Sequence, residues 1–301
     1  MLALTILGNN SAVPAFGRHP TAQVLQTLDD TYLIDCGEGT QMQMAKYKIR
    51  RAKISRIFIS HLHGDHYFGL MGLLTSMSLL GRTQDLHLYG SPALEEIVLS
   101  QFKVAAAHLS YNLIFHPLVE EGIIAEDKTI TISCFKVTHR IECFGFLFKQ
   151  KKKLRSVDAQ RAKSYEIPKS FYSKLQQGED YTNKQGTIIP NIEVTHEPTP
   201  SFSYAYSADT IYDERIIDKV RGVDLLYHES TYLKAFEERA LMHFHSTTVQ
   251  AATIATKAEV KKLLIGHFSS KYETLDEYLA ETCEVFPNTE LALEGSCFKI
   301  Q

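Results

Sequence analysis

The stretch Ser60-His61-Leu62-His63-Gly64-Asp65-His66 places three imidazoles and one carboxylate within six positions, directly after the apolar run Ile57-Phe58-Ile59. We expect the run to form a buried strand, and Gly64 can take the positive φ that a tight loop at a strand end often requires. The first two histidines would then face one point, and the aspartate and third histidine another. Imidazole nitrogen and carboxylate oxygen are ligands that Zn²⁺ accepts. The stretch therefore predicts half of a two-metal site, in preference to a polar loop whose histidines bond one another.

The composition is that of a globular protein. Of 301 residues, 44% are hydrophobic and 22% are charged, and the formal net charge of −3 argues against a uniformly basic nucleic-acid binder. The five cysteines are scattered without CxxC spacing, which predicts reduced thiols, a cytoplasmic location and no thiolate metal site. The longest N-terminal apolar run, within residues 1–7, is too short for a signal peptide or a membrane span, so we expect no membrane partner.

Hydrophobic periodicity divides the chain into strands and helices. The predicted strands cover residues 2–8, 22–28, 31–35, 56–60, 86–89, 111–115, 129–138, 143–148, 203–207, 223–227 and 261–265, with a closing pair at 290–293 and 297–300. The predicted helices cover residues 39–47, 67–80, 92–104, 213–221, 247–257 and 275–285. Because strand clusters are bracketed by helices on both outer faces, we expect an α/β fold, a four-layer αββα sandwich, built as a single domain over residues 1–301.

Residues 150–200 interrupt this pattern and are predicted to be an inserted flexible arm. The segment is polar and broken by prolines, and residues 149–174 carry nine basic and two acidic side chains. Its candidate substrate-binding residues are Lys151, Lys152, Lys153 and Arg155. Most charge runs are solvated surface loops, but a loop this long in a compact domain is more often functional.

Three further polar residues stand at the ends of predicted strands, where they would complete a two-metal site. His139 follows residues 129–138, Asp209 follows residues 203–207, and His267 follows residues 261–265. Each has a plainer interpretation by itself, since a strand-end histidine is often a surface or core residue and an aspartate before a threonine is often a turn or a helix cap. With the four groups in the opening stretch they make seven candidate ligands, so we expect all of them at one sheet rim.

At this point the motifs resemble a known family. The HxHxDH loop, His139, Asp209 and Gly266-His267 resemble the ligand set of the metallo-β-lactamase superfamily. Residues 228–232 (His-Glu-Ser-Thr-Tyr) resemble the HEAT box of ribonuclease Z, the tRNA 3′-processing endonuclease family, and residues 245–247 and 266–272 are similar to its other C-terminal signatures. Residues 7–14 and 34–41 are similar to its N-terminal boxes. The likeness runs from residue 2 to the C-terminus, and residues 150–200 fall where the family has its tRNA-clasping arm.

The resemblance has departures, none of which removes a ligand. Ser230 replaces the alanine of the HEAT box, Ala208 replaces the glycine before the metal aspartate, and Lys271 replaces an arginine. Residues 167–172 (Ile-Pro-Lys-Ser-Phe-Tyr) stand where the family's arm has a Gly-Pro-rich element. The arm therefore departs most from the family pattern.

The resemblance implies a homodimeric enzyme with two Zn²⁺ ions per chain. One ion would be held by His61, His63 and His139, and the other by Asp65, His66 and His267, with Asp209 bridging them. Asp65 would also act on the attacking water. His245 would protonate the leaving oxygen, with Glu229 orienting and stabilising it. Without the resemblance, His245 is equally well interpreted as a histidine in the N-cap region of the predicted helix 247–257.

The leading hypothesis is therefore a zinc-dependent endoribonuclease that removes the 3′ trailer from precursor tRNA and leaves a 3′-hydroxyl group. A second interpretation keeps the metals and changes the substrate, as in an arylsulfatase, a thioesterase, a lactonase or a small phosphodiesterase of the same superfamily. The basic arm and the boxes at 228–232 and 245–247 argue against it, because water attack on a small ester needs neither. A third interpretation, a non-catalytic RNA-binding or scaffold homologue, predicts lost ligands, and all seven are present.

Overall fold

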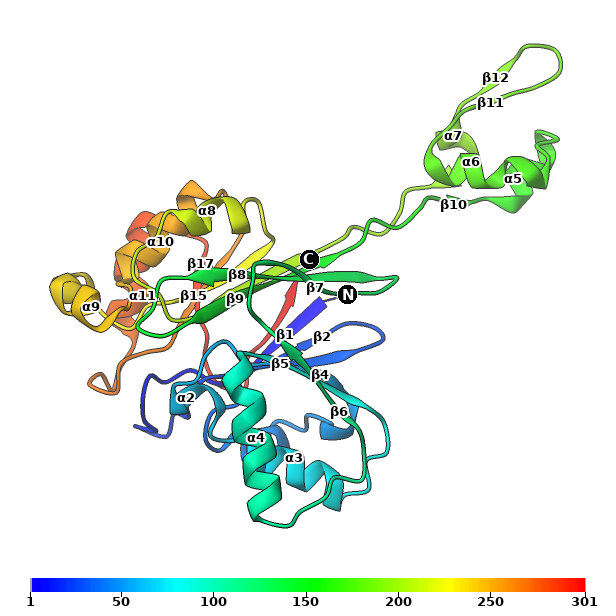
Figure 1. The fold of residues 1–301 in the computed structure, drawn as a ribbon. Coiled ribbons are helices and arrows are strands. Elements are labelled where there is room, and N and C mark those ends of the chain that lie inside the picture. Colours follow the sequence, from blue (N-terminus) through cyan, green and yellow to red (C-terminus); the bar gives the residue numbers. More distant parts are fainter. Residues whose placement is uncertain (1, 301) are drawn as a thin grey trace. The chain divides into compact units, whose positions relative to one another are not determined.

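Two seven-stranded sheets pack face to face in the computed structural model, which describes residues 2–300 (Figure 1). The strand order is β18-β1-β2-β3-β4-β5-β6 in the first sheet and β17-β16-β15-β14-β9-β8-β7 in the second. The chain divides into two compact units. Gln150–Ser201 forms what we call the insert unit, and the flanking segments form the core unit.

The first sheet contains β1 (Leu2–Gly8), β2 (Ala22–Gln26), β3 (Thr31–Ile34), β4 (Ile54–Phe58), β5 (Leu86–Gly90), β6 (Leu113–Pro117) and β18 (Cys297–Ile300). The second contains β7 (Gly122–Glu126), β8 (Ile130–Val137), β9 (Cys143–Gln150), β14 (Ser203–Ser207), β15 (Leu225–Glu229), β16 (Leu263–Gly266) and β17 (Thr289–Leu291). Between strands of the first sheet lie α1 (Thr40–Lys46), η1 (Arg51–Lys53), α2 (Gly64–Tyr67), α3 (Leu70–Leu79) and α4 (Pro92–Val104). Between strands of the second lie α8 (Arg215–Val220), η3 (Lys234–Phe236), α9 (Glu237–His243), α10 (Thr248–Lys257) and α11 (Asp276–Val285). Within residues 2–300, none of the helices combines the length and hydrophobicity that crossing a bilayer requires.

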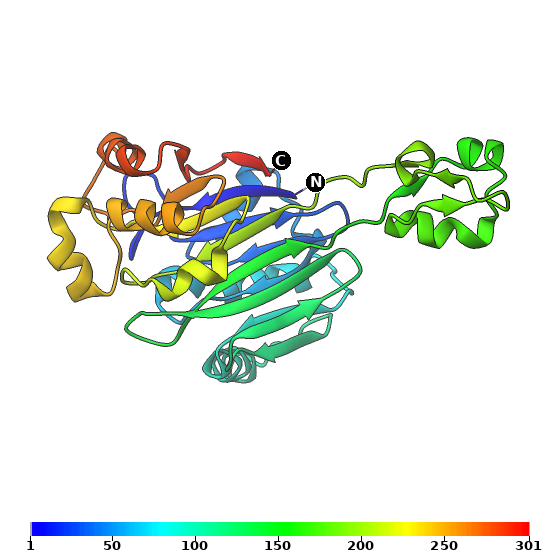
Figure 2. The same ribbon diagram turned by 90° about the horizontal axis from the view of Figure 1, so that it is seen from above.

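Apolar side chains fill the space between the sheets and the space under the helices of both outer faces. Strand β1 shows the principle, because Leu4 and Ile6 pack between the sheets while Leu7 packs under the helices of the first sheet. Helices α3 and α4 cover that outer face, and α8, α10 and α11 cover the outer face of the second sheet (Figure 1 shows the layers from the side, and Figure 2 shows them from above). The predicted four-layer αββα sandwich is therefore confirmed.

Two sets of parallel strands decide where polar side chains gather. In the first sheet β3, β4 and β5 run parallel, with Ile34 opposite Phe58. In the second sheet β14, β15 and β16 run parallel, with Glu229 opposite Gly266. Because the carboxyl ends of parallel strands lie at one edge of a sheet, the residues that follow these strands are brought to a common rim.

Two predictions about the elements of the core unit were wrong. The predicted helix at 67–80 is divided into α2 and α3. At the break, the N–H of Gly69 donates to the carbonyl oxygen of Cys36 at 2.9 Å, and the backbone is so close to Gly37 that a Cβ atom at Gly69 would lie 2.2 Å from its carbonyl oxygen. The predicted closing pair does not exist, because β17 pairs with β16 whereas β18 pairs with β1 in the other sheet. Strand β7 and helix α9 were not predicted. The other predicted elements are present with ends shifted by at most two residues.

The insert unit has secondary structure of its own, where the sequence analysis placed no strand or helix. Its elements are β10 (Ser156–Val157), α5 (Ala159–Ser164), η2 (Lys169–Phe171), α6 (Tyr172–Gln177), β11 (Tyr181–Thr182), β12 (Ile188–Ile189), α7 (Asn191–Val194) and β13 (Thr195–His196). Its small core consists of Ala162, Ile167, Leu175, Ile189 and Val194. The elements are too short for a periodic pattern to stand out, which is why the prediction failed there.

Candidate metal centre

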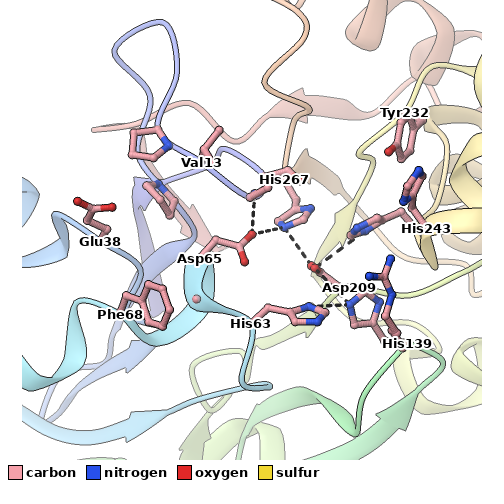
Figure 3. Close-up of a pocket in the computed structure, with 17 residues that line it drawn as sticks. Val13, Glu38, His63, Asp65, Phe68, His139, Asp209, Tyr232, His243 and His267 are labelled. Carbon is pink, nitrogen blue, oxygen red and sulfur yellow. Dashed lines mark hydrogen bonds and ion pairs between the residues drawn. The ribbon is translucent and has the colours of Figure 1, made fainter.

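Seven imidazole and carboxylate groups converge at the rim where the parallel strands end (Figure 3). The loop after β4 supplies His61 and His63, and the first turn of α2 supplies Asp65 and His66. The other three follow strands of the second sheet, with His139 after β8, Asp209 after β14 and His267 after β16. The structure thus brings together every residue that the sequence analysis named as a candidate ligand.

The first group of ligand atoms joins His61, His63 and His139. Nδ1 of His63 lies 3.1 Å from Nε2 of His61 and 3.0 Å from Nε2 of His139. Oδ2 of Asp209 lies 3.7 Å from Nε2 of His61 and 3.9 Å from Nε2 of His139. Three ring nitrogens and one carboxylate oxygen therefore face a common centre.

The second group joins Asp65, His66 and His267. Nε2 of His267 lies 3.3 Å from Nε2 of His66 and 3.3 Å from Oδ2 of Asp65. Asp209 also takes part, because its Oδ2 lies 3.4 Å from Nε2 of His66 and its Oδ1 lies 3.3 Å from Nε2 of His267. The two oxygens of Asp209 therefore reach both groups.

These spacings and donor types fit metal ions. A tetrahedral ion with ligand distances of about 2.0 to 2.2 Å keeps neighbouring ligand atoms about 3.3 to 3.6 Å apart, and the ligand atoms of each group lie within 4.8 Å of one another. Nitrogen and oxygen donors without thiolate suit Zn²⁺ among other divalent ions. The thiol of Cys143 lies 3.4 Å from Nδ1 of His61, but burial raises the pKa of Cys143 well above its ordinary value and keeps the thiol protonated.

The buried carboxylate of Asp35 orients the second group. Its Oδ2 accepts hydrogen bonds from Nδ1 of His66 at 2.7 Å and from the Tyr206 hydroxyl at 2.6 Å, and its Oδ1 accepts from the backbone N–H of Ser60 at 2.7 Å. Asp35 reaches this position with φ of 56°, a left-handed conformation that costs a non-glycine residue roughly 1–3 kcal/mol. Because Nδ1 of His66 donates to Asp35, Nε2 is left as the acceptor that a metal requires.

A chain of hydrogen bonds links His267 to His245. Nδ1 of His267 donates to Oγ1 of Thr231 at 2.8 Å, and this hydroxyl donates to Oε2 of Glu229 at 2.8 Å. Oε1 of Glu229 accepts from Nδ1 of His245 at 2.9 Å. Three backbone N–H groups also donate to the buried Glu229 carboxylate, at 2.9 to 3.1 Å. Glu229 therefore fixes the orientation of both histidine rings.

The environment of His245 favours its charged form. Burial alone favours a neutral ring, but the Glu229 carboxylate, helped by Asp209 and Asp65, raises the pKa of His245 to about 9. Since Nδ1 donates to Glu229, Nε2 of His245 faces the cavity that the residue lines. A protonated imidazole that faces a cavity is equipped to act as a general acid.

The end of α9 connects His245 with the first group. Phe244 ends the helix in the left-handed region with φ of 61°, and its carbonyl oxygen accepts from Nδ1 of His139 at 2.8 Å. The N–H of His245 donates to the carbonyl oxygen of Ala240 at 2.9 Å, which closes the helix end. The turn that ends α9 therefore orients the candidate ligand His139 and places His245 at the rim.

The groups open into a single cavity of about 590 Å³. It is lined by Ser11, Ala12, Val13, Pro14, Pro20, Glu38, His63, Gly64, Asp65, Phe68, His139, Arg140, Asp209, Tyr232, His243, His245 and His267. Figure 3 shows Val13, Glu38 and Phe68 on the side of Asp65, with His139 and His243 on the opposite side.

Sequence reasoning missed the groups that orient the ligands, namely Asp35, Ser60, Thr231 and Phe244. A signal existed for Asp35, because it directly follows strand β3 just as the predicted ligands follow their strands. No comparable signal existed for Phe244, because it acts through its carbonyl oxygen, which any residue would supply.

The candidate substrate-binding residues of the insert unit differ in their surroundings. Lys152 and Lys153 are exposed, and Lys151 is partly exposed. Arg155 instead donates from Nε to Oγ1 of Thr195 at 2.7 Å and pairs with Glu197. Arg155 therefore holds the insert unit together, whereas Lys152 and Lys153 face solvent.

Comparison with known proteins extends these observations. Residues 2–177 match the family model of the Anti-Pycsar protein Apyc1. The ribonuclease Z of Bacteroides thetaiotaomicron is 39% identical over 299 residues, which cover 99% of this chain and 95% of that protein. Human tRNase Z, short form, is 26% identical with a TM-score of 0.74, and the match covers 99% of both chains. The metallo-beta-lactamase fold protein YhfI from Bacillus subtilis is 18% identical with a TM-score of 0.70, and the match covers 99% of this chain and 100% of that one.

The two-sheet architecture and the rim of imidazoles and carboxylates define a metal-dependent hydrolase of the metallo-β-lactamase fold. The full-length relatives decide the finer classification, because Asp209, Glu229, His245 and His267 all lie outside residues 2–177. The chain belongs to the ribonuclease Z family.

Proposed function

We propose that this protein is a zinc-dependent endoribonuclease that cuts the 3′ trailer from precursor tRNA and leaves a 3′-hydroxyl group on the tRNA. The observation that carries the proposal is the position of His245, whose Nδ1 lies 2.9 Å from Glu229 and 3.9 Å from Asp209 at the rim of candidate ligands. A site that places an acid beside metal ligands suits a phosphodiester with a poor leaving group. The relatives named ribonuclease Z and tRNase Z support RNA as the substrate.

Two Zn²⁺ ions would bind at the rim. The first would be held by His61, His63 and His139 and the second by Asp65, His66 and His267, with Asp209 as the bridge. When bound, the ions would supply Lewis acidity and positive charge to the phosphate, a contribution of several kcal/mol. The contacts of Asp209 support two positions rather than one, because its Oδ1 lies 3.3 Å from His267 of the second group while its Oδ2 lies 3.7 Å from His61 of the first.

Asp65 would orient the attacking water and accept its proton. Its Oδ2 accepts the backbone N–H of Ala12 at 2.7 Å and lies 3.3 Å from Nε2 of His267. Burial opposes ionisation, but His66 and His267 hold the pKa of Asp65 well below its usual range. The carboxylate is therefore ionised and available to the water.

His245 would protonate the leaving oxygen, and Glu229 would hold it in place for that step. Release of a tRNA with a 3′-hydroxyl group makes the ribose 3′-oxygen the leaving group. An alkoxide of such high pKa leaves slowly, so a proton delivered as the bond breaks lowers the barrier, typically by about 10²- to 10⁴-fold in rate. Nε2 of His245 faces the cavity in which the phosphate would lie.

The insert unit would bind the body of the tRNA away from the metals. The exposed Lys152 and Lys153 support this role, because each Lys or Arg that neutralises a phosphate releases condensed counterions. Lys151 and Arg155 would contribute positive charge, and Arg155 also stabilises the unit through Thr195. The proposal extends to a homodimer, carried over from the family resemblance, and to a cytoplasmic location, indicated by the scattered cysteines. Light scattering during size-exclusion chromatography tests the dimer.

The decisive experiment compares substrates. Zinc-loaded protein is incubated with a precursor tRNA, an unstructured RNA, a thioester and an aryl sulfate, and the products are analysed for bond position and end groups. We expect cleavage of the precursor at the base of the trailer with a 3′-hydroxyl end. Preferred turnover of the thioester or the aryl sulfate would replace the proposal by the second interpretation, a hydrolase of small substrates.

A further inference from the structure

Arg140 stands directly after the candidate ligand His139 and is not engaged by the protein. Its side chain is exposed and lines the catalytic cavity, where it is the sole lysine or arginine among the described lining residues. Within residues 2–300, no hydrogen bond or ion pair of the Arg140 side chain to another residue is present. An arginine left free beside carboxylates and histidines has its five N–H donors available for a ligand.

A second cavity begins at the same residue. It measures about 690 Å³ and shares His139 and Arg140 with the catalytic cavity. Four cations and two carboxylates contribute to its lining of Glu121, Lys136, Val137, Thr138, His139, Arg140, Ile141, Glu142, Arg215 and Lys219. The second cavity is therefore lined by more cations than carboxylates, and it borders the catalytic cavity at His139 and Arg140.

The other three cations of the second cavity already have partners. Lys136 lies 3.7 Å from Glu142, Lys219 lies 2.7 Å from Glu121, and Arg215 lies 2.6 Å from Asp213. These pairs neutralise the three cations and leave little charge available to a ligand. Arg140 is thus the cation that an incoming anion would meet at the junction of the two cavities.

The position of Arg140 also indicates on which side of the cleaved phosphodiester bond it acts. The rings of His139 and His245 lie 5.2 Å apart, and Figure 3 shows His139 and His243 on the side opposite Val13 and Phe68. Arg140 follows His139 in the chain. Burial lowers the pKa of His243 and the charge of Arg140 helps to lower it, so we assign Arg140 to the side of the proposed general acid. In the proposed reaction the acid faces the ribose 3′-oxygen, which belongs to the last nucleotide of the mature tRNA. The nearest further phosphate on that side is the one on the 5′ side of this nucleotide.

We propose that Arg140 binds this phosphate, the first one upstream of the cut, and that the second cavity receives the strand leading to it. This inference rests on the proposed function and adds a substrate subsite to it. Arginine suits the task because its planar guanidinium donates two parallel hydrogen bonds to a phosphate. The contact positions the nucleotide whose 3′-oxygen receives the proton from His245.

Arg140→Gln tests the contact, with Arg140→Lys as the conservative variant and Arg221→Gln as the matched control. Arg221 is a half-exposed arginine paired with Asp218 that lines neither cavity. We expect Arg140→Gln to lower kcat/KM for precursor tRNA by about 10- to 100-fold, as the loss of a hydrogen bond to a charged group does, with zinc content and nitrophenyl phosphodiester turnover unchanged. Arg140→Lys should restore part of the loss, and Arg221→Gln should cause none.

Precursors with one neutral methylphosphonate linkage locate the phosphate. With the linkage upstream of the last tRNA nucleotide neutral, wild type and Arg140→Gln should cleave equally well. With a neutral linkage downstream of the cut, the full difference between the two proteins should remain. Coupling to a downstream linkage, or to none, would overturn the inference. Failure of the wild type to cleave any precursor would instead overturn the proposed function, so the two failures are distinguishable.

Discussion

The core unit and the insert unit differ in the exposure of their charged side chains. At the rim of the core unit, Asp35, His66 and Glu229 are at most 1% exposed, and hydrogen bonds hold each of them. In the insert unit, Lys152 and Lys153 point to solvent, and the buried part is a small apolar core. In the core unit the charged side chains are held in a fixed geometry by hydrogen bonds. In the insert unit the exposed lysines are available to bind a partner.

This difference separates bond cleavage from substrate binding. Buried charges interact strongly. Because these interactions shift pKa values, their contribution to the free energy of unfolding depends on pH. Exposed charges are screened, so their interactions depend on salt. We therefore expect changes in the core unit to affect cleavage of every substrate, and changes in the insert unit to affect only the binding of a large polyanion.

The largest expected effect follows from Asp209→Ala, because both groups lose their shared ligand. Zinc content should fall at both positions, and turnover of RNA and of a nitrophenyl phosphodiester should fall by about 10³-fold or more, since bound metal contributes several kcal/mol. Elemental analysis and steady-state kinetics measure both. Asp224→Ala, which removes a buried carboxylate bonded to Ser203, is the control and should keep its zinc. Loss of one ion alone would contradict the bridging role.

His245→Ala should slow RNA cleavage by about 10²- to 10⁴-fold while nitrophenyl phosphodiester turnover changes little, because nitrophenolate leaves without a proton. The matched control is His243→Ala, a histidine that lines the same cavity and stacks on Tyr232 with ring centroids 6.3 Å apart. Rates measured on both substrates for the wild type and the two variants distinguish a general acid from a structural residue. Equal losses on both would show that His245 has a structural role.

The pair of His245 and Glu229 should make the stability of the metal-free core depend on pH. The pKa of His245 is raised from 6.5 to about 9, so the pair stabilises fully below about pH 6.5 and loses this contribution as the pH rises through 9. The loss amounts to about 3 kcal/mol at most. Denaturant unfolding at about pH 6 and pH 10 should show it in the wild type and not in His245→Gln. Replacing Lys152 and Lys153 by glutamine should leave it unchanged, and an equal pH dependence in all the proteins would refute the assignment.

Asp35→Asn should have a smaller effect, strongest at the second group, whose ligand His66 bonds Asp35 directly. Losing the carboxylate that accepts from Nδ1 of His66 typically lowers metal affinity by about 10- to 100-fold. The first group should be affected less, because Asp35 reaches it only indirectly, through the Ser60 hydroxyl that contacts His61, while the carbonyl oxygen of Phe244 orients His139 independently. Stepwise zinc titration with a competing chelator resolves the two ions. Weaker binding of both to the same extent would contradict this separation.

The sequence predicted the core unit well because its elements are long and its motifs local. Strand β1 agrees at both ends, and all seven candidate ligands meet at the expected rim. What failed depends on contacts between distant residues. The chain leaves β17 and crosses to the other sheet at Gly295, whose N–H donates to the carbonyl oxygen of Ile6 at 2.8 Å, and no local pattern predicts that.

The insert unit resisted prediction for a different reason. Its helices have six residues or fewer, so none completes the repeats by which an apolar face is recognised. Its charge was visible in the sequence, but its packing was not. In the sequence, Arg155 could not be distinguished from the neighbouring lysines. Only the structure shows that it donates a hydrogen bond to Thr195 and forms an ion pair with Glu197.

The most direct test of the separation between cleavage and binding removes the insert unit. In a variant with residues 151–201 replaced by a short Gly/Ser linker, zinc content and nitrophenyl phosphodiester turnover are measured beside binding of precursor tRNA over a range of salt concentrations. The account predicts nearly intact zinc content and turnover, weaker tRNA binding, and a flatter salt dependence, by roughly 0.7 to 0.9 in the log-log slope for each lost phosphate contact. A variant that binds and processes precursor tRNA as well as the intact protein would contradict the account.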